Sequence, residues 1–214
     1  MPLHFQEAPK VTVDALNAAL PRIAQRASVA THAPAISQSV GALMRRRFGS
    51  GEAGPAPARA AAEPIAAPVH VIGLSDIAAK RDLKAAPVKL WAHLLHTDDD
   101  DHPVAVADTD AKTGHFQSIT EGAPVAALGR RIRAVQAEQA KAQDHDLAII
   151  RVPALYLDAL WLKGRNGAPD VVIPEDSPMS PLTAGKRYTL EEFNAALKPT
   201  ADRLLRETDP TKGG

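Results

Sequence analysis

The pattern of apolar and polar positions separates an Ala/Pro-rich stretch from the segments on either side of it. Residues 51–68 read GEAGPAPARAAAEPIAAP, in which twelve of eighteen positions are Ala or Pro. Proline removes backbone donors and alanine buries little surface, so this stretch cannot offset the entropy lost on ordering. We therefore predict a helical N-terminal arm at 1–50, a disordered linker at 51–68, an α+β globular domain at 69–208 and a frayed tail at 209–214.

The N-terminal arm contains two segments with apolar residues at helical spacing. Thr12 is a candidate N-cap for the first segment, which also contains Val13. Helices this short are marginal in isolation, so each apolar stripe must pack on the globular domain or on a partner. We expect a partner protein to bind the seven apolar residues Leu16, Leu20, Ile23, Ile36, Val40, Leu43 and Phe48.

The first half of the globular domain is predicted to contain a strand, a helical region and a hairpin. VHVIGL at 69–74 is a short apolar run typical of a strand. The segment 75–97 is predicted to be helical, with Ser75 as its cap and a break at Pro87. Alternating apolar residues on both sides of a polar turn at 102–120 indicate a β-hairpin.

The second half is predicted to begin and end with a helix. Residues 121–143 have an apolar face at helical spacing, with arginines on the other faces. The apolar stretch 147–163 is rich in β-branched and aromatic residues and contains a proline, so we interpret it as one bent strand or two strands. Another strand is expected at 168–174. The helix at 189–207 starts with a capping box, Thr189 with Glu192.

This order of elements predicts an α+β fold. Strand pairs separated by a long helix favour an antiparallel or mixed sheet, here of about four to five strands, with helices mainly on one face. The helical N-terminal arm and the flexible Ala/Pro-rich linker precede this sheet.

The composition limits the class of protein. Lys+Arg and Asp+Glu are balanced at 25 each, which argues against nucleic acid as a partner. There is no cysteine, so disulfides and thiolate metal sites are excluded. The sequence shows neither a signal peptide pattern nor an apolar run of about 20 residues, so we expect a soluble cytoplasmic protein without a membrane span. The Ala, Arg and Pro content is typical of a GC-rich bacterial genome.

The segment HLLHTDDDDH at 93–102 has the side chains of a metal site. Four consecutive aspartates point in different directions, however, so at most two could converge on one ion. An EF-hand starting at Asp98 or Asp99 would need glycine at its sixth position, where Pro103 and Val104 stand. We therefore interpret this segment as the end of a helix running into a solvated loop, and we predict no metal and no cofactor.

Two other features have a chemical and a structural interpretation. Asp108 and Asp110 alternate before Gly114 in the manner of calcium ligands, but Asp and Gly also form hairpin turns, which we favour here. The basic runs Arg45–Arg47 and Arg130–Arg133 could contact phosphates, but short runs on a neutral chain indicate solvated helix faces. Nucleophile, zinc-protease and phosphate-loop motifs are all missing from the sequence.

Three functions remain open at the level of the sequence. The leading hypothesis is a non-enzymatic protein-binding or adaptor module, with its amphipathic arm presented on the linker. The second is an enzyme with a cleft lined by the histidines and carboxylates of 93–115. The third is a phosphate- or nucleic-acid-binding protein that uses the two basic runs.

Overall fold

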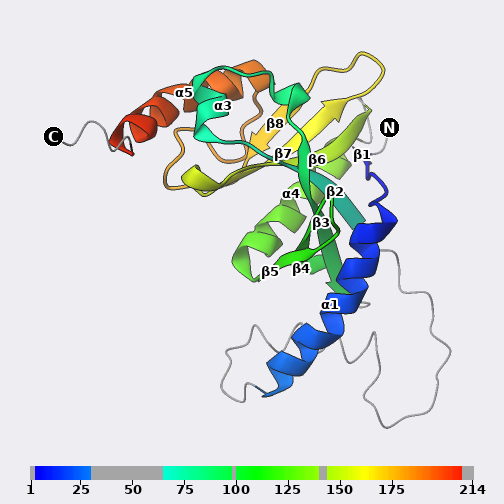
Figure 1. Cartoon of the computed structure of the whole chain (residues 1–214). Coiled ribbons are helices and arrows are strands. Elements are labelled where there is room, and N and C mark those ends of the chain that lie inside the picture. Colours follow the sequence, from blue (N-terminus) through cyan, green and yellow to red (C-terminus); the bar gives the residue numbers. More distant parts are fainter. Residues whose placement is uncertain (1–2, 30–64, 98–99, 140–143, 209–214) are drawn as a thin grey trace, which may run out of the picture. The chain divides into compact units, whose positions relative to one another are not determined.

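The computed structural model describes residues 3–29, 65–97, 100–139 and 144–208, which form an α+β fold with a mixed sheet (Figure 1). Its strands are β1 (Leu3–His4), β2 (Ile65–Val71), β3 (Val88–Thr97), β4 (Asp100–Asp110), β5 (Phe116–Glu121), β6 (His145–Val152), β7 (Leu157–Gly164) and β8 (Val171–Pro174). The α-helices among the described residues are α1 (Lys10–Val29), α3 (Leu74–Ala78), α4 (Ala123–Gln139) and α5 (Leu190–Glu207). The strands are ordered β5-β4-β3-β2-β6-β7-β8, and β1 pairs with β6.

The sheet has eight strands, so the prediction of four to five strands is wrong. The main cause is β3, which we predicted as part of a helix. Five consecutive residues from Trp91 to Leu95 are buried, so this strand shows no alternation of apolar and polar positions. An apolar run that is covered on both sides looks the same in sequence whether it is a helix or a strand. The short strand β1 carries no sequence pattern at all.

The chain forms two compact units, and unit 1 comprises residues 1–6, 67–90 and 131–214. Its central strand is β6, which pairs antiparallel with β7 along its whole length, from His145 opposite Gly164 to Val152 opposite Leu157. The predicted stretch 147–163 is therefore two strands. The opposite edge of β6 pairs in parallel with β1 and with β2. Because β2 starts at Ile65, the last four residues of the predicted linker are strand.

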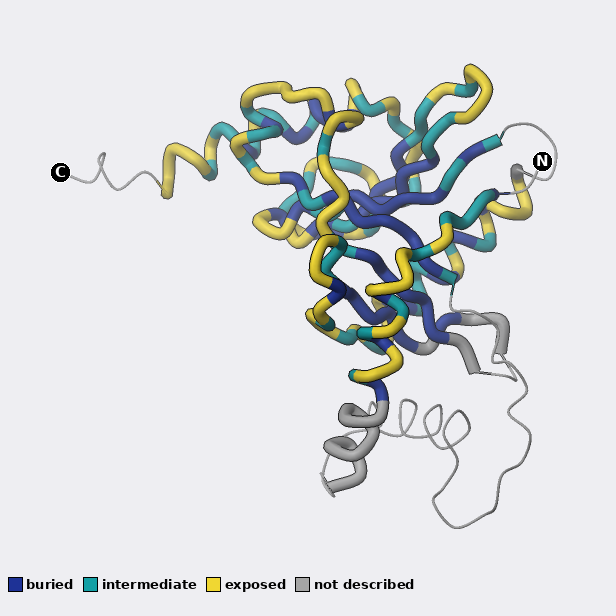
Figure 2. The backbone as a smooth tube through the Cα atoms, turned by 45° about the vertical axis from the view of Figure 1, so that its right-hand side comes forward, coloured by how far each residue is buried: buried dark blue, intermediate teal, exposed yellow. Residues whose placement is uncertain are grey.

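The core of unit 1 lies between this sheet and the helices α3 and α5. Trp161 and Ile150 of the sheet belong to one buried cluster with Phe193 and Leu197 of α5. Figure 2 shows that buried, intermediate and exposed positions alternate along α5, the helix before the C-terminal end. This pattern is expected of an amphipathic helix.

Capping explains where the helices of unit 1 begin. The Thr189 side chain accepts from the Glu192 backbone N–H at 3.1 Å, and the Glu192 carboxylate accepts from the Thr189 N–H at 2.8 Å, so the predicted capping box is confirmed. Helix α3 begins two residues earlier than predicted: its N-cap is Gly73, and Ser75 lies inside the helix. The carboxylate of Asp76 accepts from the Gly73 N–H and replaces the expected serine cap.

Unit 2 comprises residues 7–66 and 91–130 and contains the β4–β5 hairpin. The hairpin confirms the prediction at 102–120, and α4 confirms the predicted helix at 121–143. Helix α4 packs closely on β4 at Gly129, where a Cβ would lie 2.5 Å from Cδ of Pro103. Glycine is therefore required at this helical position, where alanine is normally the better helix former.

Helix α1 packs on the hairpin of unit 2. Leu16 and Leu20 are fully buried in a cluster with Leu95, Ala105 and Ala107. The predicted first helix of the N-terminal arm is therefore present, but its apolar face is covered by the chain's own strands. Among the described residues, no helix combines the length and the apolar character needed to cross a membrane.

We predict that Leu16→Ala lowers the free energy of unfolding by about 2–5 kcal/mol, the usual cost of truncating a fully buried leucine. Asp14→Ala is the matched control, because Asp14 lies in the same helix and is exposed; it should change stability by less than about 0.5 kcal/mol. Urea denaturation followed by circular dichroism measures both values. Equal stability of the two variants would show that α1 is not part of the core.

Candidate functional site

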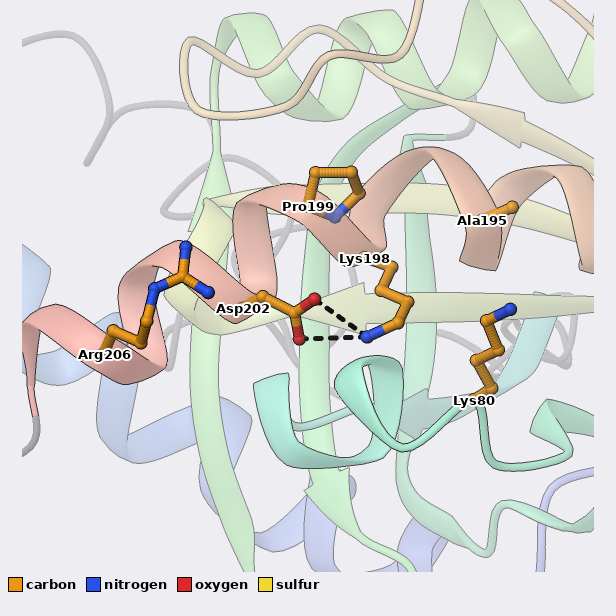
Figure 3. A pocket seen from close by; sticks show the side chains of 6 residues that line it. All are labelled: Lys80, Ala195, Lys198, Pro199, Asp202 and Arg206. Atoms are coloured by element: carbon orange, nitrogen blue, oxygen red, sulfur yellow. Dashed lines mark hydrogen bonds and ion pairs between the residues drawn. The ribbon is translucent and has the colours of Figure 1, made fainter.

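An open groove runs along α5 in unit 1. It consists of two shallow depressions of about 400 and 440 Å³, which share Lys80 and Ala195. We call it the basic groove, and its lining residues are Lys80, Arg81, Asp82, Leu83 and Lys84 on one side and Leu190, Glu191, Asn194, Ala195, Lys198, Pro199, Asp202 and Arg206 of α5 on the other. Figure 3 shows one end, where Lys80 faces the side chains of α5 from the segment after α3.

Backbone hydrogen bonds hold the 80–84 wall of the groove in place. Lys80 has a left-handed backbone, with φ of 50°, and ends α3 by donating its N–H to the Ile77 carbonyl at 3.0 Å. The next residue, Arg81, donates its N–H to Asp76 and forms an ion pair of 2.6 Å with the same residue. Asp82 accepts from the Lys84 N–H at 2.9 Å and starts a short 3₁₀ helix. The basic side chains of this wall therefore extend from a fixed backbone.

The groove is lined by five basic side chains and three acidic ones: Lys80, Arg81, Lys84, Lys198 and Arg206 against Asp82, Glu191 and Asp202. Arg81 and Lys84 are paired with Asp76 and Asp170, which lie outside this lining. Lys198 is neutralised by Asp202 at 2.8 Å. Within the described ranges, no ion pair involves Lys80 or Arg206, so these two charges are available to a ligand.

Asn194 joins the two walls of the groove. Its Nδ2 donates to the Arg81 carbonyl at 3.4 Å, which connects α5 to the 80–84 segment. Its Oδ1 is buried and accepts no hydrogen bond from the residues that the structure describes. An unsatisfied acceptor of this kind is costly.

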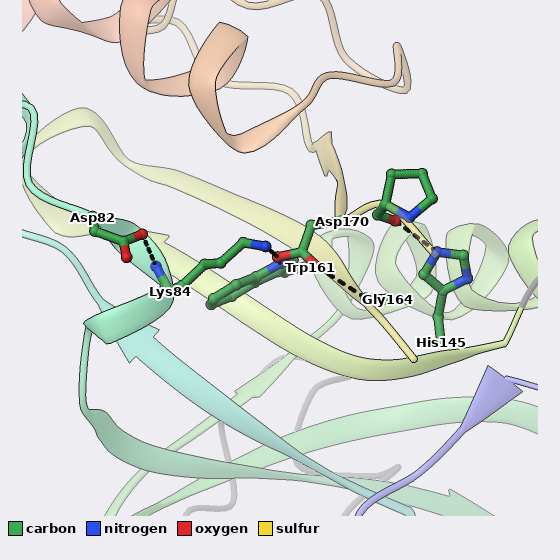
Figure 4. Close-up of polar contacts among 7 residues, drawn as sticks. Asp82, Lys84, His145, Trp161, Gly164 and Asp170 are labelled. Carbon is green, nitrogen blue, oxygen red and sulfur yellow. Dashed lines mark hydrogen bonds and ion pairs between the residues drawn. The ribbon is translucent and has the colours of Figure 1, made fainter. Parts of the chain in front are cut away.

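A second polar cluster of unit 1 surrounds Trp161. The indole N–H donates to Asp170 at 3.2 Å, and the other carboxylate oxygen of Asp170 accepts from the Gly164 N–H at 3.0 Å. Figure 4 shows Lys84 reaching the same carboxylate, with its Nζ 3.4 Å away. Nζ of Lys163 lies over the Trp161 ring, 4.3 Å from the ring centroid. Lys84 thus belongs to both the basic groove and this cluster.

The histidine and aspartate segment at 93–102 is arranged differently from our prediction. Residues 93–97 and 100–102 are strand rather than the end of a helix, and 98–99 lie outside the described residues. His93 is fully buried in unit 2, where its Nε2 lies 3.0 Å from Oγ1 of Thr109. Burial lowers the pKa of His93 to about 4, against the opposing effect of Asp108. His93 is therefore a neutral core side chain at physiological pH.

The turn interpretation of the segment 108–115 is confirmed. The carboxylate of Asp110 accepts from the backbone N–H groups of Lys112 and Thr113 and from the Thr113 hydroxyl. These bonds lower the pKa of Asp110, chiefly through the Thr113 backbone N–H. Gly114 has a φ of 73°, which suits glycine in a turn. Across the described ranges, no three His, Asp or Glu side chains gather in a way that could hold a metal ion.

The predicted partner-binding residues have different outcomes. Leu16 and Leu20 are buried in the core of unit 2, so their side chains are not available to a partner, and the prediction is corrected for these two. Ile23 lies in α1, but its side chain is outside the described set. The remaining residues, Ile36, Val40, Leu43 and Phe48, also lie outside the described residues, so their role stays a prediction.

Of the two basic runs, only the second lies among the described residues. Arg45–Arg47 fall outside them. In the second run, Arg131 forms an ion pair with Glu175 at 3.3 Å, whereas Arg130 is exposed. The basic residues of the groove were missed by sequence reasoning because 80–84 and α5 are more than 100 residues apart in the chain and each looks like an ordinary solvated surface.

No protein family model, curated protein sequence or solved structure matches this chain. The chemistry of the groove and of the Trp161 cluster is therefore the basis for a functional proposal.

We predict that His93 makes stability depend on pH in the acidic range. Its pKa is about 4 in the folded state and about 6.5 when unfolded, so the unfolded chain binds the extra proton in this window. Stability therefore falls as the pH falls from about 6.5 to about 4, by on the order of 3 kcal/mol for this group.

The measurement is urea denaturation at several pH values in this window. His93→Gln should reduce the pH dependence, because glutamine can still bond to Thr109 but does not titrate. His115→Gln is the control, since His115 is exposed on the same hairpin and should leave the dependence unchanged. A His93→Gln variant with the full pH dependence of the wild type would contradict the prediction.

Proposed function

We propose that this protein is a non-enzymatic protein-binding module whose basic groove receives an extended, acidic segment of a partner protein. The observation that carries the proposal is the pair of basic side chains, Lys80 and Arg206, that project at the groove without an ion pair among the described residues. Carboxylates are the natural counter-ions for such side chains.

The shape of the groove supports a chain rather than a small molecule as its ligand. Small-molecule sites are concave and enclose most of their ligand, with mainly apolar walls. The two depressions here are open to solvent and lie end to end along α5. An extended segment can follow such a surface and contact both depressions.

Apolar side chains add a reason to expect a peptide. Leu83 and Leu190 line one end of the groove, so a peptide can bury some apolar surface there.

The hypothesis that the N-terminal arm binds a partner protein is kept for only part of the arm. Leu16 and Leu20 belong to the core, so the part of the arm proposed to bind a partner is limited to the region from Ile23 to Phe48, whose side chains the structure does not describe. The groove and this region are separate candidates for protein contact, and the groove is the one supported by described geometry.

We predict that phage display of random peptides on the full chain enriches sequences rich in Asp and Glu, and that fluorescence polarisation of the enriched peptides shows salt-sensitive binding. The double variant Lys80→Glu with Arg206→Glu should weaken binding about tenfold or more, which corresponds to about 1.4 kcal/mol.

Lys112→Glu is the matched control, because Lys112 is an exposed lysine on the β4–β5 turn, outside the groove. It makes one charge reversal on the surface and should leave binding nearly unchanged. Enrichment of apolar or basic peptides would contradict the proposal, and so would equal binding by the double variant and the wild type.

A further inference from the structure

The register of unit 1 places a lysine and a histidine on one face of the sheet. His70 of β2 is paired with Ile150 of β6, and Ile150 is paired with Ala159 of β7. Directly paired residues point to the same side, and side chains alternate along a strand. Trp161 and Lys163, two and four residues after Ala159, therefore lie on the same face as His70.

The hydrogen bonds of His70 fix which of its ring nitrogens carries the proton. Its Nδ1 lies 2.7 Å from the Ala86 carbonyl, which can only accept, so Nδ1 carries the hydrogen. In the neutral ring, Nε2 is then an acceptor, and Nζ of Lys163 lies 3.0 Å from it. Lys163 therefore donates to a nitrogen that can also take up its proton.

The Trp161 ring holds the amine from a second direction. Nζ of Lys163 is 4.3 Å from the centre of the ring, and the His70 ring meets the same indole edge-on at 4.9 Å. His70 is buried, whereas Lys163 is partly exposed. The amine is therefore held between an imidazole and an indole, on a residue that is not fully buried.

The electrostatics of the pair agree with this geometry. Burial lowers the pKa of Lys163, against the opposing effect of the carboxylates of Asp170 and Asp146. Burial also lowers the pKa of His70, as does the neighbouring Lys163, while the bond to Ala86 raises it. Asp170 is itself paired with Lys84 at 3.4 Å, which weakens its hold on the Lys163 ammonium.

We propose that Lys163 is a covalent attachment site for small aldehydes, with His70 as the proton acceptor for its amine. This site is separate from the peptide proposed for the basic groove and does not depend on it. A lysine amine that is partly desolvated and held in a fixed position is the usual arrangement for imine formation in proteins.

The proposed reaction converts the amine and the aldehyde into an imine and water. The lone pair of Nζ attacks the carbonyl carbon, so a C–N bond forms and the C=O double bond becomes a single bond. Nε2 of His70 takes one proton from the nitrogen and returns it to the oxygen. The second nitrogen proton leaves with the hydroxyl group as water, and the nitrogen lone pair forms the C=N bond. No oxidant or reductant is consumed.

The experiment treats the intact wild-type chain with propionaldehyde and cyanoborohydride, which reduces each imine to a stable secondary amine. Peptide mass spectrometry then gives the rate at each lysine over a range of pH. We expect Lys163 to react on the order of tenfold faster than the exposed Lys112 at neutral pH, since general acid–base assistance is typically worth at least that much. Reaction at Lys163 no faster than at Lys112 would overturn the proposal.

His70→Gln separates the role of the base from the exposure of the lysine. Glutamine can still accept a hydrogen bond but cannot take up a proton at neutral pH, so labelling of Lys163 should slow to about the rate of Lys112, with Lys112 unchanged. Undiminished labelling of Lys163 in a folded His70→Gln variant would remove His70 from the proposal. If circular dichroism shows that the variant is unfolded, the wild-type pH profile decides: the rate at Lys163 must level off at a lower pH than the rate at Lys112.

Discussion

The pairing of β6 on both of its edges is the constraint on which unit 1 depends. Its antiparallel partner β7 occupies one edge along all eight residues, and β1 and β2 share the other. Six of its eight residues are buried, so both faces are covered as well. A strand with no free edge and no free face can satisfy its backbone groups only in this register, because a shift of one residue would exchange the two faces.

This register also decides where polar side chains can lie in the sheet. On the face under α5, the positions near the middle of the strands are Ala148, Ile150 and Trp161, all buried with Phe193. Toward the end of β7 the same face continues to Lys163, which is only partly buried. Burying a charge is costly unless it is paired, and Lys163 meets this requirement with His70 and the Trp161 ring. The reactive pair thus lies where the apolar cover of the sheet ends.

Elements whose signals are local were predicted from the sequence, and those that depend on distant partners were not. The capping box of Thr189 and Glu192 defines the start of α5 within four residues, and the turn chemistry of Asp110 and Gly114 defines the hairpin. Strand β3 was predicted as a helix because its consecutive buried residues give no period of two. The His70–Lys163 contact joins positions 93 residues apart, and neither residue has a signal in its own neighbourhood.

The two outcomes for the arm residues and for the groove also depend on contacts between distant parts of the chain. An amphipathic stripe shows that a helix must cover an apolar face, but it carries no information about which chain supplies the cover. For Leu16 and Leu20 the cover is the hairpin of unit 2. The basic groove presents the opposite case. In the sequence, the 80–84 segment and α5 each look like an ordinary solvated surface, and only folding brings their charged side chains together. Binding by this chain is therefore to be sought at charges that folding gathers and leaves unpaired, rather than at apolar residues that folding already covers.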